Sequence, residues 1–175
     1  MEIIKTWTEI IYNIISALSF IAVGFWVIYR FVLQKERFPN LNFSAGINVI
    51  GKQNDFYIVE LIAIVENRGK SQHKMEELKL DLDAVFVNDG VETSEEWGGQ
   101  INFPNHLLTA SYLPAGRGHF FVDPGTEAKY SYIFKVPIET NFLMLHSRFN
   151  YIGRKRSEHA AEKTIKIDHA KYSES

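Results

Sequence analysis

Cysteine is absent from the 175-residue chain, which excludes a disulfide framework and a thiol nucleophile. A G-x-S-x-G elbow, an H-E-x-x-H helix, a P-loop and a glycine-rich dinucleotide fingerprint are missing as well. Each of these motifs marks a common catalytic or cofactor-binding mechanism. We therefore expect a protein that is not an enzyme and that uses no cofactor, in a reducing compartment.

A basic excess is also missing, since 19 lysines and arginines face 21 acidic residues and the formal net charge is −2. Proteins that bind nucleic acid in general need a basic face, so this balance argues against such binding. The six histidines do not pair at the spacing of metal ligands. We expect no metal site.

One long stretch, in contrast, lacks charge. The 20 residues from Ile10 to Tyr29 contain no charged side chain, and as a helix they span about 30 Å, the thickness of the hydrocarbon layer. The apolar run continues past "SALS", the only small-residue candidate for signal cleavage, which indicates a retained anchor; the alternative is an interfacial helix or a helix buried in a protein core. Tryptophan and tyrosine at both ends favour the headgroup regions. We predict a short tail over 1–9, a transmembrane helix over 10–33 and a linker over 34–40.

Basic residues indicate the orientation of this span. Arg30, Lys35 and Arg37 follow it, whereas Lys5 alone precedes it. Because an excess of lysine and arginine marks the cytoplasmic side, the C-terminal domain is predicted to be cytoplasmic.

A stripe of residues along the span is a candidate helix–helix interface, because small residues let helices approach and an amide in lipid needs a partner. Small residues are also common in spans that make no such contact. The stripe consists of Asn13, Ala17, Phe20 and Gly24.

The remainder of the chain shows strand patterns and no helical period. Apolar and polar residues alternate from Leu41 to Val49, and again in "LKLDLDAVFV", where Leu78, Leu80, Leu82 and Ala84 face inward and Asp81 and Asp83 read as a solvated face. "FYIVELIAIVEN" is apolar on both faces, as expected for a central strand covered on each side. Residues 91–118 read as an irregular excursion with one or two short strands.

Turn chemistry divides the last third into further strands. "DPGTE" predicts a turn through Pro124 and Gly125 that opens the strand "AKYSYIFKV". "FLMLHSRFNYI" and "EKTIKI" follow. We predict an all-β domain over 41–169, either a sandwich or a small β-barrel, and a flexible C-terminal tail over 170–175.

The segments "VELIAIVENRGKSQHKMEELKLDLDAV" and "DPGTEAKYSYIFKVP" resemble immunoglobulin-like and fibronectin-like sandwiches, in which a central strand ends in Asn-x-Gly and a Pro-Gly turn opens a late strand. The whole chain also resembles a small bacterial family of single-pass membrane proteins. The resemblance implies an Ig-like antiparallel β-sandwich and a bacterial inner-membrane location, and it assigns no role to any residue.

Three places are candidates for ligand or lipid contact. "PAGRGHFF" places Arg117 and His119 on a glycine-rich loop. The guanidinium of Arg117 can form two parallel hydrogen bonds to a phosphate or carboxylate. The alternative is a flexible loop that only connects two strands. Arg148 lies on the same strand face as His146. The two side chains could line a pocket together, or His146 could be a partly buried residue that is hydrogen-bonded to a backbone carbonyl. "GRKRSEH" contains three consecutive cations, which could contact anionic lipid or a phosphate group or could lie in a solvent-exposed turn. They are Arg154, Lys155 and Arg156.

These features favour a membrane-anchored binding or assembly module that acts through protein–protein contacts, with the lipid bilayer and either itself or another membrane protein as partners. The alternative is a nucleotide-gated oligomerising effector, which the anchor-plus-β-domain layout resembles in bacterial antiphage defence. In that case Arg117, Arg148 or Arg154 would hold an anionic nucleotide.

Overall fold

The computed structural model describes residues 2–30, 40–95, 98–152 and 158–172. The chain divides into two compact units, Met1–Phe38 and Pro39–Ser175.

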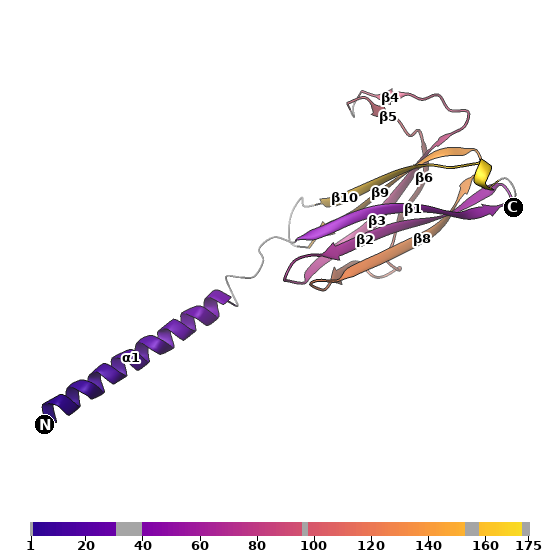
Figure 1. Ribbon diagram of the computed structural model, residues 1–175. Helices are drawn as coiled ribbons and strands as arrows, with labels where there is room; N and C mark the ends of the chain where they lie inside the picture. The colour runs from indigo at the N-terminus through magenta and orange to yellow at the C-terminus, as the bar shows by residue number, and fades with distance from the viewer. Residues whose placement is uncertain (1, 31–39, 96–97, 153–157, 173–175) are drawn as a thin grey trace. The chain divides into compact units, whose positions relative to one another are not determined.

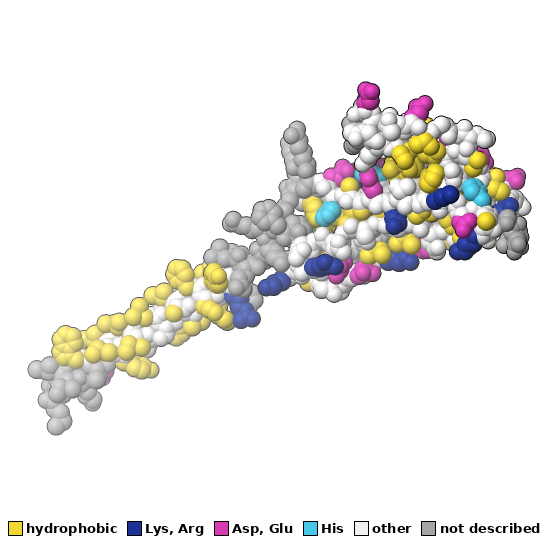
Figure 2. Space-filling view, turned by 45° about the horizontal axis from the view of Figure 1, so that its top comes forward, with side chains coloured by type: hydrophobic (Ala, Val, Ile, Leu, Met, Phe, Trp, Pro, Cys, Tyr) yellow, Lys and Arg dark blue, Asp and Glu magenta, His cyan; other side chains and the backbone are white. Residues whose placement is uncertain are grey.

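The described residues of the first unit, 2–30, contain one α-helix, α1 (Glu2–Ile28). Its stretch Glu9–Ile28 is long and apolar enough to cross a membrane, and none of that stretch is buried against protein. Figure 2 shows the apolar side chains that cover it. The helix begins near the chain start, within the tail expected over 1–9, and ends before residue 33. The four stripe residues Asn13, Ala17, Phe20 and Gly24 are all exposed along it, and their role as a helix–helix interface stays a prediction.

The second unit is built from antiparallel strands in two main sheets (Figure 1). The three-stranded sheet has the order β1 (Leu41–Gln53), β2 (Phe56–Asn67), β8 (Glu127–Pro137). The five-stranded sheet has the order β10 (Glu158–Lys166), β9 (Thr140–Tyr151), β3 (His73–Phe86), β6 (Asn105–Ser111), and β7 (His119–Val122) pairs with the first part of β3. The all-β prediction with one N-terminal apolar helix is confirmed.

One hydrophobic core joins the inner faces of the two sheets. Alternation places Leu80 and Leu82 of β3 in it, fully buried as expected, opposite Val59 and Leu61 of β2. The outer face of β2 is only half-buried, so the expectation that this strand is covered on both sides was wrong. Within the described residues no further layer packs on that face.

The excursion over 91–118 contains more strand than expected. A short hairpin pairs β4 (Thr93–Ser94) with β5 (Gln100–Ile101), and the seven residues of β6 then join the main sheet beside β3. The register of β6 on β3 shifts between Leu82 and Asp83, which interrupts the period of two. The sequence pattern of β6 was therefore not recognisable as a strand.

Asn67 ties the end of β2 to two other segments. Its fully buried side-chain amide donates to the carbonyl oxygens of Ser71 and Val122 at 3.0 and 2.9 Å, and its Oδ1 accepts from the N–H of Gly69 at 2.9 Å. The predicted turn follows nearby, with Gly125 at φ 72°. The Asn-x-Gly signal in the sequence thus marks a hydrogen-bonded junction.

The C-terminal segment is attached to the domain beyond the expected boundary at residue 169. Residues Ala170–Tyr172 form a 3-10 turn, η2. The ring of Tyr172 lies edge-on to Tyr57 at 5.8 Å between centroids, and its hydroxyl donates to the carbonyl of Val49. These contacts close the end of the core between β1 and β2.

Candidate binding groove

Four adjacent strands place polar side chains on the outer face of the five-stranded sheet. Because side chains alternate along a strand, the residues between the core leucines of β3 and β9 point outward. The outward residues are Asp81 and Asp83 from β3, His106 and Thr109 from β6, His146 and Arg148 from β9, and Glu162 from β10.

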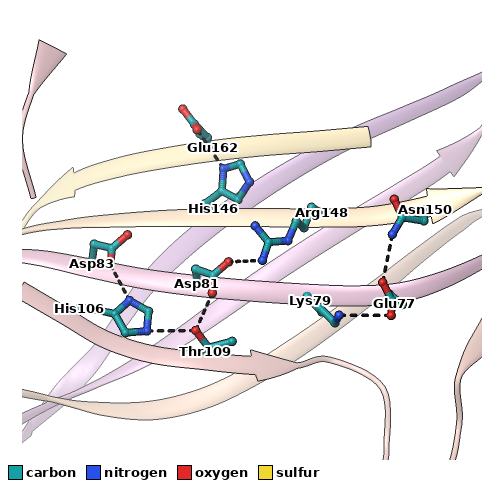
Figure 3. Close-up of polar contacts among 10 residues, drawn as sticks. All are labelled: Glu77, Lys79, Asp81, Asp83, His106, Thr109, His146, Arg148, Asn150 and Glu162. Carbon is teal, nitrogen blue, oxygen red and sulfur yellow. Dashed lines mark hydrogen bonds and ion pairs between the residues drawn. The ribbon is translucent and has the colours of Figure 1, made fainter. Parts of the chain in front are cut away.

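Five of these side chains form one connected network across three strands (Figure 3). Arg148 Nη2 lies 3.1 Å from Asp81 Oδ2, and the hydroxyl of Thr109 donates to Asp81 Oδ1 at 2.6 Å. The same hydroxyl lies 3.0 Å from Nε2 of His106, whose Nδ1 lies 2.7 Å from Asp83 Oδ1. Each side chain is held by a hydrogen bond to the next, so the network is ordered without a ligand.

A second pair lies beside this network. His146 Nδ1 is 2.9 Å from Glu162 Oε1, which joins β9 to β10. A side-chain carboxylate, and not the backbone carbonyl considered from the sequence, is thus the partner of His146. The pair extends the polar surface to the next strand (Figure 3).

The segment that contains β4 and β5 encloses this surface from one side. The polar half of the resulting hollow has a volume of about 520 Å³ and includes Asp81, Asp83, His106 and Arg148 in its lining. An apolar half of about 420 Å³ adjoins it and adds Val85, Val91, Phe142 and Thr164. Both halves share Gln100, Ile101, Phe103, Met144 and Glu162, so we treat them as one site and call it the groove. Figure 2 shows apolar side chains next to acidic and histidine side chains near the hairpin.

The charge of the groove is unbalanced toward acid. Asp81, Asp83 and Glu162 contribute carboxylates, whereas Arg148 is the only lysine or arginine among the described lining residues and is paired with Asp81. The side chains of Asp81 and Asp83 are only 16% and 22% exposed, so water screens them incompletely. The groove therefore favours a cationic group over a polyanion.

Thr109, His106 and Asp83 stand in the order of a hydroxyl–imidazole–carboxylate triad. The distances of 3.0 and 2.7 Å fall within the range used for nucleophile activation. The hydroxyl of Thr109 has one proton, however, and the Asp81 carboxylate at 2.6 Å competes for it. With His106 more than half exposed, we interpret the trio as part of the structural network.

The structure brings together some of the predicted site residues and not others. Arg148 lies in the groove. Arg117 lies on the exposed connection between β6 and β7, where its N–H donates to the carbonyl of Pro114, and His119 opens β7 opposite Glu76. The three cations Arg154, Lys155 and Arg156 lie outside the described residues. Within the described part of the chain, no cluster of three or more histidine and acidic side chains is arranged to hold a metal ion.

Sequence reasoning missed most of the groove. The alternating pattern predicts a solvated face for Asp81 and Asp83, and it gives no role to His106 or Glu162. Alternation identified the face of each strand, but the pairing of β3 with β6 and of β9 with β10 decides which residues meet. A surplus of acidic residues on the outward face of a leucine-rich strand was the available signal.

Comparison with known proteins yields only weak structural similarity. No family model matches the chain, and no curated protein matches it. Among solved structures, structural-genomics target SoR45 aligns with a TM-score of 0.45 at 13% identity, covering 73% of this chain and 86% of that one. The sporulation control protein Spo0M from Bacillus subtilis aligns with a TM-score of 0.42 at 12% identity, covering 71% and 48%. The ApaA protein from Bordetella pertussis gives 0.46 at 12%, covering 74% and 94%. Similarities this low transfer no function.

Proposed function

We propose that this chain is a membrane-anchored, non-enzymatic binding module whose β domain holds a segment of a partner protein in the groove. The observation that supports the proposal is the pairing of an acidic half and an apolar half in one organised hollow. Binding sites typically combine apolar walls with a few fixed polar groups. The polar groups here are already held by mutual hydrogen bonds, which lowers the entropic cost of binding.

The partner segment that fits is an extended peptide in which a lysine or arginine adjoins an apolar side chain. The cation would meet Asp83 and Glu162, whose neighbours His106 and His146 leave carboxylate oxygens free to accept further hydrogen bonds. The apolar side chain would enter between Phe103 and Met144. Neither half alone is large, so the combination supplies the selectivity.

The finer fold and the location belong to the same proposal. An immunoglobulin-like sandwich is supported by the strand orders: β1-β2-β8 can be matched to strands A, B and E, and β10-β9-β3 to strands G, F and C. The basic residues after the span support a bacterial inner-membrane protein with a cytoplasmic β domain. The anchor would keep the groove next to other membrane proteins.

A nucleotide-gated effector is supported less well. The phosphates of a nucleotide would meet one guanidinium that is already paired, among three carboxylates. Arg117 is not among the groove residues. A polyanionic ligand is therefore disfavoured at this site.

Peptide binding to the full chain in nanodiscs tests the proposal. The probes are fluorescent peptides that pair one lysine or arginine with apolar neighbours, and the same peptides with glutamate in place of the cation. We expect the cationic set to bind at least about tenfold more tightly, and the D83N/E162Q variant to lose that preference. Asp55→Asn, which removes an exposed carboxylate from the β1–β2 turn, is the matched control. Equal binding of both peptide sets, or an equal loss in the control, would contradict the proposal.

A further inference from the structure

The free edge of β8 is the feature from which we infer a second interaction surface. Along its whole length, from Glu127 opposite Glu66 to Pro137 opposite Phe56, β8 pairs with β2 on one side. Among the described residues no strand pairs with its other side (Figure 1). The corresponding outer strand of the same sheet, β1, instead packs beside β10.

The backbone of this edge lacks the features that usually prevent strand addition. An unpaired strand presents a row of N–H and C=O groups, and proteins commonly blunt such edges with bulges, prolines, short strands or charged side chains. Charged side chains are present on β8, but an edge that pairs with a second copy can place opposite charges against each other. β8 has 11 residues, a continuous register on β2, and a proline only at its last position. Ile133 is also 65% exposed on its outer face. The strand therefore remains competent to pair.

The outward side chains of β8 complement themselves. Residues on this face alternate as Glu127, Lys129, Ser131, Ile133 and Lys135. If two copies pair antiparallel about Ser131, Glu127 of each copy lies opposite Lys135 of the other. Opposite charges on directly opposed residues stabilise a strand pair. Lys129 then lies opposite Ile133, with its own charge already balanced by Glu60 at 3.6 Å.

The charges also select this register over its neighbours. A pairing centred on Tyr132 would place Lys129 opposite Lys135, and like charges in that position are destabilising. A pairing centred on Tyr130 would leave Lys135 beyond the strand pair and put Glu127 opposite Ile133. On the core-facing side, the register about Ser131 places Tyr130 opposite Tyr132, an aromatic cross-strand pair.

We propose that two copies of this chain join through their β8 edges, in antiparallel register about Ser131, to form one continuous six-stranded sheet. The partner is a second copy because Glu127 and Lys135, at the two ends of β8, lie opposite each other when the strand pairs with itself. The interface does not involve the groove, so it goes beyond the binding function proposed above. Anchoring in a common membrane raises the local concentration of the two domains and favours the pairing.

The absence of cysteine permits a direct test in the full-length chain in its membrane. Ser131→Cys places one thiol at the two-fold axis, and a short thiol-to-thiol crosslinker should then join two copies. Ser44→Cys is the matched control, since it replaces an exposed serine on β1 of the same sheet. We expect crosslinked dimer from the Ser131 variant at least about tenfold above the control.

Charge reversal tests the register. In the Ser131→Cys background, Lys135→Glu should lower dimer yield about tenfold, because two attractive pairs become two repulsive ones. Adding Glu127→Lys to that variant should restore the yield, since the pairs are then reversed but complementary. Circular dichroism confirms that each variant is folded. Equal crosslinking in the Ser44 control, or no recovery in the doubly reversed variant, would overturn the proposal.

The two proposals fail independently. Variants that abolish β8 pairing should bind the cationic peptides with unchanged affinity, and the D83N/E162Q groove variant should crosslink through Ser131→Cys as well as the parent does.

Discussion

Asn67 offers the sharpest test of what holds the β domain together. Its side chain is fully buried and makes three hydrogen bonds, to Ser71, Val122 and Gly69, that link β2 to β7 and to the following turn. Asn67→Ala removes all three while the backbone bonds of residue 67 remain. At about 1 kcal/mol net for each bond, the free energy of unfolding should fall by about 3 kcal/mol. That is a large part of the stability of a typical domain.

Asn67→Asp refines the same prediction. One carboxylate oxygen can still accept the hydrogen bond from the N–H of Gly69. The other oxygen replaces the donor amide and faces the carbonyl oxygens of Ser71 and Val122, which are also acceptors. The substitution also places a charge in a buried site. Burial would raise the pKa of this carboxyl in the folded protein, so the native state would bind the proton more tightly than the unfolded chain. We therefore expect Asn67→Asp to be less stable than Asn67→Ala at pH 7.5 and to recover stability as the pH falls.

The measurement is urea unfolding of the full chain in detergent micelles, followed by the far-ultraviolet circular dichroism of the strands. Asn42→Ala is the control, because the exposed Asn42 donates to Glu66 at the surface and its loss should cost less than about 0.5 kcal/mol. If Asn67→Ala were as mild as Asn42→Ala, the reasoning from buried hydrogen bonds would be refuted.

Further predictions concern stability and orientation. Burial lowers the pKa of His159, so protonation favours the unfolded chain, and stability should decline as the pH falls below about 6.5; His159→Asn should flatten this decline in unfolding titrations, and an unchanged slope would contradict it. Tyr112→Phe should cost about 1 kcal/mol, because the buried hydroxyl of Ser147 loses its partner at 3.1 Å, and a double-mutant cycle with Ser147→Ala should show coupling. Glu77 has φ 56°, so Glu77→Gly should be more stable than Glu77→Ala by about 1 kcal/mol in the same unfolding assay, and the reverse order would argue against backbone strain. A reporter enzyme that works only in the cytoplasm should be active when it is fused to the C-terminus, and an inactive fusion would contradict the predicted orientation.

Local patterns in the sequence predicted most of the elements. The uncharged run predicted an N-terminal helix, and the structure has α1 there. Alternation of apolar and polar residues predicted the inward faces of β1 and β3, because side chains of a strand alternate wherever it pairs. Turn chemistry at Pro124 and Gly125 predicted the start of β8. These signals are local and need no knowledge of neighbouring strands.

Irregular positions escaped the same reasoning. In β3 the backbone of Glu77 has positive φ, and a register shift between Glu76 and Lys79 lets both Met75 and Leu78 face the core. No period of two includes both residues. A bulge of this kind depends on the pairing of β3 with β9, so the sequence around it resembles a break in the strand.

The sequence by itself determined that the chain has two parts: an apolar N-terminal helix with an uncharged stretch, and a β domain whose strands each have an apolar face. Only the tertiary structure decided which strands adjoin, and with that the groove, because Asp83, His106 and Glu162 come from three strands distant in sequence. The physical reason is that strand pairing is set by non-local hydrogen bonds and by the fit of one core, neither of which leaves a local pattern. The free edge of β8 follows from the same cause, since an edge exists only by reference to the strands beside it.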